Sequence, residues 1–138
     1  MSLSMFIEIE AGAILGEVRS VLASLSANFE EREKGLSGFF PDSNCYFVFN
    51  CDSEPKDIVV EGVEVSWTVG VRGGFHYRAD NLHSSWQDIV RFMRAYSSYH
   101  SHRFILSFHY ETIYAVRGES GLRIVEAMSG GEGVDNNL

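Results

Sequence analysis

The sequence has little proline and little cysteine, and it lacks any long apolar segment. With two prolines in 138 residues, nothing in it resembles a proline-rich linker between domains. No run reaches the roughly 18–20 apolar residues that a membrane-spanning helix needs. Glu8 and Glu10 interrupt the apolar residues near the N-terminus, unlike a signal peptide. We therefore expect one cytoplasmic domain over residues 1–128, without membrane contact, and a flexible Gly- and Asn-rich tail over 129–138.

The two cysteines, Cys45 and Cys51, lie six residues apart. If the chain between them is extended, their Cα atoms are about 20 Å apart, whereas a disulfide requires less than about 7 Å. We therefore predict buried, free thiols. Because an apolar strand raises the pKa of a thiol, neither cysteine is a good candidate for a nucleophile.

Motifs that would indicate an enzyme are also missing. The chain has no GxSxG elbow and no glycine-rich phosphate loop of the GxxxxGK[ST] or GxGxxG type. The absence of such motifs favours a binding protein over an enzyme, and we expect no cofactor.

Basic residues are scarce in the first half of the chain. Net charge is −8. Residues 1–62 contain eleven acids and four basic residues, whereas residues 63–138 contain eight acids, seven arginines and no lysine. The negative electrostatic potential of such a chain repels nucleic acids and anionic lipids, and it favours either a basic protein partner or simple solubility.

Hydrophobic periodicity predicts an α+β fold. The predicted elements are a strand over residues 5–10, a helix over 12–28, strands over 44–50 and 63–71, a helix over 83–97, and strands over 104–110, 113–117 and 122–126. The order β-α-β-β-α-β-β-β lacks βαβ alternation. It therefore favours a two-layer sandwich in which two helices cover one face of a mainly antiparallel sheet.

The clearest strand signal is the alternation of Val63, Val65, Trp67, Val69 and Val71 with polar residues. We expect Gly73-Gly74 to break this strand and residues 51–62 to form a loop. The predicted core contains Val65, Trp67, Val69, Trp86, Ile89 and Met93.

The histidines offer a weak metal-site candidate. His100 and His102 would lie on one side of an extended segment, and His109 and Glu111 could join them. No HExxH or CxxC pair accompanies them. We therefore predict that the protein holds no transition metal.

The segment from Arg72 to Arg78 combines two adjacent glycines with aromatic and basic side chains. Such a loop can approach a ligand closely and grip carboxylates or phosphates, or it can simply connect two elements. If it forms a ligand pocket, the candidate residues are Arg72, Gly73, Gly74, His76 and Arg78.

Phe39 and Phe40 are adjacent and cannot both face inward easily. They are either core residues or an exposed aromatic pair of the kind found at protein-binding hot spots. In the second case we expect a partner-binding site made of Phe39, Phe40, Asp52, Glu54 and Asp57.

In composition and predicted fold class the chain is similar to the small cytoplasmic immunity and antitoxin proteins of bacteria, which are acidic α+β domains without catalytic motifs. That resemblance implies an inhibitor that occludes a basic partner such as a toxin. Two alternatives stay open: a homo-oligomeric structural domain such as a homodimer, and a small-ligand-binding domain or enzyme with a pocket near Gly73–Arg78.

Overall fold

The structure is a computed structural model that describes residues 2–126, without the side chains at positions 2, 52 and 53. The tail expected over 129–138 lies outside the described residues. In chain order the elements are β1 (Ser2–Glu10), α1 (Leu15–Ser24), β2 (Asn28–Arg32), β3 (Gly35–Phe39), β4 (Tyr46–Lys56), β5 (Val69–Arg78), the 3-10 turn η1 (Ala79–Asn81), α2 (Leu82–Tyr99), β6 (Phe104–Phe108), β7 (Thr112–Gly118) and β8 (Gly121–Ile124).

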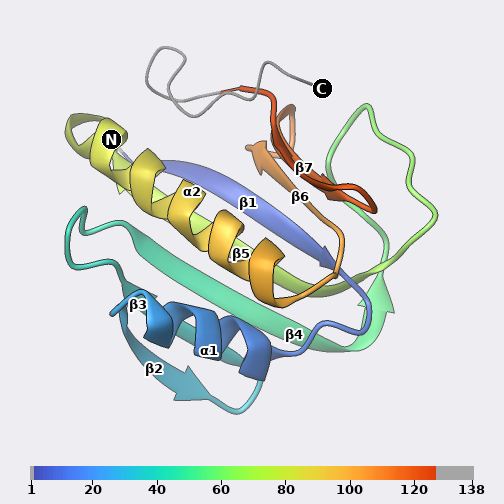
Figure 1. Cartoon of the computed structure of the whole chain (residues 1–138), viewed down its shortest axis with the longest axis horizontal. Coiled ribbons are helices and arrows are strands. Elements are labelled where there is room, and N and C mark those ends of the chain that lie inside the picture. Colours follow the sequence, from blue (N-terminus) through green and yellow to red (C-terminus); the bar gives the residue numbers. More distant parts are fainter. Residues whose placement is uncertain (1, 127–138) are drawn as a thin grey trace.

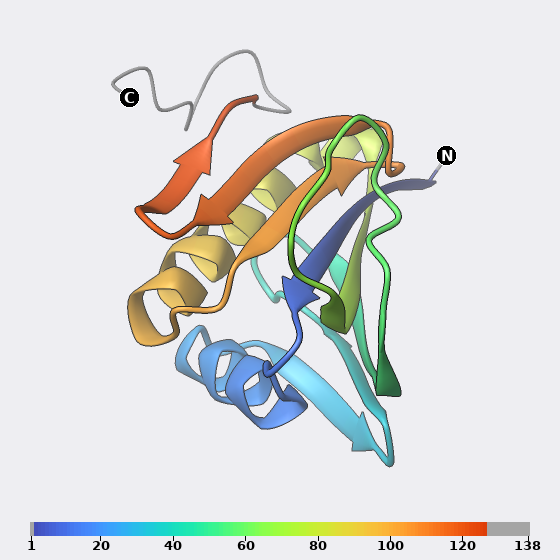
Figure 2. The same ribbon diagram turned by 90° about the vertical axis from the view of Figure 1, so that its right-hand side faces the viewer.

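All eight strands form one antiparallel sheet in the order β2-β3-β4-β5-β1-β6-β7-β8. Both helices lie on the same side of this sheet, as Figure 1 and the perpendicular view in Figure 2 show. The predicted two-layer α+β class is therefore confirmed. The element order differs from the prediction by two additional strands, β2 and β3, between the first helix and β4.

The predicted helix over 12–28 is too long. Helix α1 ends at Ser24, and Ser26 has a φ of 60°, in the left-handed region that a continuing helix does not use. Residues 28–39, which follow this helix, form the antiparallel hairpin of β2 and β3. Consecutive residues of β2 face opposite sides: Glu31 contacts Arg19 of α1 at 3.1 Å, while Arg32 donates to Ser37 of β3 at 3.0 Å.

The predicted strand over 63–71 is wrong for residues 63–68, and the loop predicted over 51–62 begins only after Lys56, where β4 ends. Residues 57–68 form a loop, and β5 begins at Val69 and continues through Gly73-Gly74 to Arg78. A Cβ atom at Gly73 would lie 2.4 Å from the ring of Phe49 and 3.0 Å from Ile7. This glycine therefore lets an aromatic ring pack against a central strand and does not end that strand.

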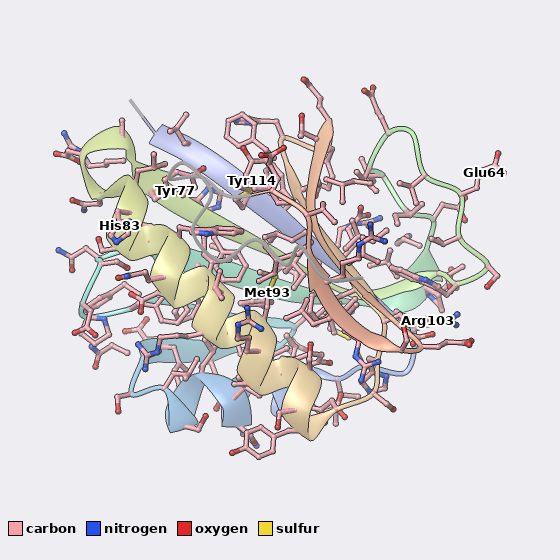
Figure 3. All side chains as sticks on the ribbon, turned by 45° about the horizontal axis from the view of Figure 1, so that its top comes forward. Glu64, Tyr77, His83, Met93, Arg103 and Tyr114 are labelled. Carbon is pink, nitrogen blue, oxygen red and sulfur yellow. The ribbon has the colours of Figure 1, made fainter. Side chains whose placement is uncertain are left out.

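We call residues 57–68 the cover loop, because it lies on the side of the sheet away from the helices (Figure 2). The alternation of apolar and polar residues in this loop reflects alternating burial of the side chains and not the pairing of a strand. Val63, Val65 and Trp67 are half-buried, whereas the residues between them are exposed. Glu64, labelled in Figure 3, projects away from the sheet.

The main core lies between the sheet and the helices. Trp86, Ile89 and Met93 of α2 are buried in it, as predicted. Val69 is buried outside the main cluster, and the prediction fails for Val65 and Trp67, which belong to the cover loop. Within the described residues, no helix has the length and apolar character needed to cross a membrane.

Candidate functional site

The sheet face opposite the helices, here called the open face, carries exposed aromatic side chains on neighbouring strands. Phe39 of β3 pairs in register with Tyr46 of β4, which pairs with His76 of β5. Directly opposite residues share a face of the sheet. Phe39 is 41% exposed and Tyr46 is 43% exposed, and the rings of Tyr46 and His76 have centroids 6.2 Å apart.

The aromatic side chains continue onto β1 and the turn after β6. The ring of Phe6 stacks on that of Tyr110 with centroids 4.3 Å apart and planes within 2° of parallel. Phe6 also meets the ring of His76 edge-on at 6.3 Å. We refer to Phe39, Tyr46, His76, Phe6 and Tyr110 as the aromatic row. It crosses the open face from β3 to the β6–β7 turn.

A cavity of about 310 Å³ opens beside the middle of this row. Its lining residues are Phe6, Val48, Asn50, Arg72, Gly73, Gly74, His76 and Tyr110. We call it the Gly74 cavity, because a Cβ atom at Gly74 would lie 3.0 Å from Nε2 of His76 and 3.4 Å from the ring of Phe6. A side chain at this position would therefore press against both rings.

The lining of the Gly74 cavity combines apolar groups with a few polar ones and has little net charge. Arg72 contacts the buried carboxylate of Glu8 at 3.3 Å, so the two charges offset each other. Burial lowers the pKa of His76, which keeps its imidazole neutral near pH 7. Burial also raises the pKa of Tyr110, assisted by the charge of Glu8, so its hydroxyl stays protonated.

Glu8 also fixes the cover loop next to this cavity. Its carboxylate accepts hydrogen bonds from the backbone N–H groups of Val59 at 2.8 Å and Val60 at 3.1 Å. Arg72 additionally donates to the carbonyl of Asp57. The Glu8 carboxylate therefore anchors one part of the cover loop, and backbone hydrogen bonds of Glu61 with Tyr110 and of Thr68 with Ala11 attach two others.

The structure separates the two phenylalanines that the sequence places side by side. Phe39 is exposed on the open face, whereas Phe40 is 2% exposed and packs in the core against Phe47 and Phe75. Phe40 is therefore a core residue, whereas Phe39 is exposed, and a role of Phe39 in partner binding stays a prediction. Of these two phenylalanines, Phe39 is the one that can contact a partner in this conformation.

The acids proposed for the same site do not surround Phe39. Glu54 is exposed in β4, and Asp57 is exposed just after it. Glu54 lies eight residues from Tyr46 along the strand, about 26 Å at the usual rise. Asp52 belongs to β4, and its side chain is not described. Aromatic and acidic residues thus occupy opposite ends of β4.

The alternative ligand site is brought together in part. Alternation along β5 places Arg72, Gly74 and His76 on the open face, whereas the vacant side-chain direction of Gly73 points to the core. Arg78 is exposed and pairs with Asp80 at 3.7 Å. Sequence reasoning missed the contributions of four other lining residues, Phe6, Val48, Asn50 and Tyr110, which come from other elements of the fold.

The histidine candidates divide between two places. His100 and His102 both contact the carboxylate of Glu17, at 3.2 and 3.1 Å. His109 lies in the turn at the other end of β6. Within residues 2–126, no group of three or more histidine, cysteine or acidic side chains is arranged to hold a metal ion. The expected absence of metal in solution stays a prediction.

Neither Cys45 nor Cys51 forms a disulfide. Burial, with a smaller contribution from the charge of Asp88, raises the pKa of Cys45 to about 12, whereas Cys51 is half-buried. Because the thiolate is the reactive form, we expect iodoacetamide at pH 8 to label Cys51 well before Cys45. Peptide mass spectrometry over a time course measures the two rates. Equal labelling of the native protein would contradict this burial of Cys45.

Comparison of the chain with protein-family models, with curated proteins and with solved structures found no match.

Proposed function

We propose that the chain is a non-enzymatic binding domain that holds a basic protein on the open face of its sheet and blocks that protein by occlusion, as an immunity or inhibitor protein does. The observation that carries this proposal is the aromatic row. Its two most exposed members, Phe39 and Tyr46, are more than two-fifths exposed on adjacent strands. Aromatic side chains contribute disproportionately to binding energy at protein interfaces.

The charge of the chain supports a basic partner. The net charge is −8, and Glu54 and Asp57 are exposed where β4 passes into the cover loop. Because these two acids lie far from Phe39, we assign them a different role from that of the aromatic row. Exposed acids at the periphery accelerate encounter with a basic protein, while aromatic contacts determine how long the complex lasts.

The hydrogen bond between Ser4 and His76 suggests a catalytic pair at first sight, because Oγ and Nδ1 are 2.8 Å apart beside the cavity. In a Ser-His-Asp triad, a carboxylate orients the imidazole. Here the Ser4 hydroxyl is the hydrogen-bond partner of the His76 ring, and no carboxylate within residues 2–126 forms an ion pair or hydrogen bond with that ring to complete a triad. The pair is therefore better explained as a structural contact that fixes the His76 ring in the aromatic row.

Replacing Tyr46 with alanine is expected to raise the dissociation rate of the complex about tenfold or more, since truncation of an interface hot spot costs at least about 1–2 kcal/mol. The partner is first obtained by affinity purification from the native host, and rates are then measured by surface plasmon resonance. Tyr99→Ala is the matched control, because Tyr99 is 68% exposed on α2, in the helical layer. Equal effects of the two variants would exclude the open face as the interface.

Reversing Glu54 and Asp57 together to lysine should act on association instead. We expect a slower association rate and a weaker dependence on ionic strength, with little change in dissociation.

If purification returns only a tight homodimer, the oligomer alternative replaces this proposal. A metabolite that raises Tm, with an effect abolished by Arg72→Ala, would favour the ligand-binding alternative.

A further inference from the structure

We propose that the Gly74 cavity is the anchor pocket of the open face and that it receives an uncharged aromatic side chain, tryptophan or tyrosine, from the partner. This inference rests on the proposed function and adds the chemistry of the residue that the partner must present. It follows from three properties of the cavity: its size, its walls and its charge.

The volume of about 310 Å³ is at the lower end of the range of pockets that hold small molecules. It suits one ring system better than an extended ligand. Gly74 lets the two rings lie close to the strand, because a Cβ atom there would press against both His76 and Phe6 and displace them. The neighbouring lining residue Val48 is half-buried and borders the cavity from β4.

The walls are flat and held in place. Phe6 is fixed by its stacked contact with Tyr110, and His76 is fixed by its hydrogen bond to Ser4. Planar groups pack well against such rings in offset or edge-on arrangements. Since the rings are already ordered in the free chain, a partner residue would lose less free energy to ordering on binding.

The electrostatics select against a charged group. Glu8 neutralises Arg72, and the imidazole and the phenol in the lining are both uncharged near pH 7. No net charge therefore compensates a carboxylate or an ammonium for the loss of its hydration. Asn50 and His76 still provide hydrogen-bonding groups for the polar edge of an indole or a phenol. These are the two uncharged ring side chains enriched at interface hot spots.

The test uses the free chain and the probe N-acetyl-tryptophanamide, with N-acetyl-tyrosinamide as a second probe. Titration is followed by ¹H–¹⁵N NMR, and we expect saturable shifts centred on Val48, Gly74 and His76 with a Kd of about 1 mM, as a single-ring fragment allows. N-acetyl-leucinamide and N-acetyl-argininamide should bind at least about tenfold more weakly, because neither combines an uncharged polar edge with an aromatic face.

Two variants fill the pocket from different strands. Gly74→Ala adds a methyl group at its floor, and Val48→Phe adds a ring from β4; each should weaken probe binding tenfold or more. Gly118→Ala is the matched control, since a Cβ atom there has no neighbour within 4 Å, and it should bind the probe like the original chain. Val48→Phe keeps the test decisive if Gly74→Ala does not fold.

The anchor inference is overturned if the aromatic probes produce no saturable shifts, if they shift residues elsewhere, or if the leucine derivative binds equally well. Failure here is distinguishable from failure of the proposed function. If Tyr46→Ala weakens the partner complex while the probes do not bind, the binding face stands without this anchor. If the probes bind as expected but the host yields no partner, the pocket stands and the protein-binding proposal falls.

Discussion

The Phe49→Ala variant is expected to lose about 3–5 kcal/mol of unfolding free energy, the usual cost of removing a large buried ring. Phe49 is completely buried and has ring contacts with Phe47, Phe75 and Phe92, the last of which belongs to α2. Its removal therefore opens a cavity between the two layers. The total free energy of unfolding of an ordinary domain is about 5–15 kcal/mol. Urea denaturation followed by circular dichroism should show a much lower midpoint.

Gly73 offers a sharper version of this test. Gly73→Ala alone should cost about 1–3 kcal/mol, because its methyl group would collide with the Phe49 ring. In the double variant that collision is absent, and the methyl group fills part of the cavity. The double variant should therefore lose less than the sum of the two single losses. Strict additivity would show that the two residues do not touch.

Trp67→Ala provides the comparison for an aromatic residue outside the core. Trp67 is half-buried in the cover loop, so its truncation should cost clearly less than that of Phe49. A loss as large as that of Phe49→Ala would place Trp67 in the main core, as its periodicity alone suggests, and would contradict the loop conformation.

The sequence predicts elements well where local periodicity and tertiary contacts agree. The helix expected over 83–97 is present as α2, Leu82–Tyr99, because its apolar stripe is the one that packs on the sheet. The strands expected over 104–110, 113–117 and 122–126 are present as β6 to β8 with small changes at their ends. The hairpin at Gly118–Gly121 follows from turn chemistry alone.

Prediction fails where a pattern has two physical causes. Alternation along residues 63–68 is typical of a strand, yet here it arises because a loop lays every second side chain toward the sheet. A glycine pair is typical of a turn, yet Gly73 serves the close approach of Phe49 from β4. No local window of sequence contains both residues, so the decision between these causes requires the tertiary structure.

The candidate site shows the same limit. Alternation could have grouped Arg72, Gly74 and His76 if the segment had been taken as extended. The stacking of Phe6 on Tyr110 joins residues 104 positions apart, and it depends on β1 lying between β5 and β6. Strand order of this kind is a long-range property. The aromatic row therefore becomes visible only when the register of the sheet is known.

Replacing Glu8 with alanine is expected to cost up to about 3–5 kcal/mol, the range for removing one partner of a fully buried ion pair, because the Arg72 side chain keeps 23% exposure. The Glu8 side chain is 1% exposed. Its loss takes the carboxylate from Arg72 and leaves the N–H groups of Val59 and Val60 without their acceptor. Glu8→Gln, which retains one acceptor oxygen and the shape of the side chain, should cost less than Glu8→Ala.

The region of the chain that Glu8→Ala destabilises is as informative as the size of the loss in unfolding free energy. Because Glu8 holds the cover loop, hydrogen exchange at the amides of Val59 and Val60 should accelerate in Glu8→Ala beyond what the loss of global stability explains. Glu10→Ala is the matched control on the same strand. Glu10 accepts hydrogen bonds from Arg103 at 2.7 and 2.8 Å, away from the anchored amides. If Glu10→Ala accelerates exchange at Val59 and Val60 as much as Glu8→Ala does, the buried carboxylate is not the anchor of the cover loop.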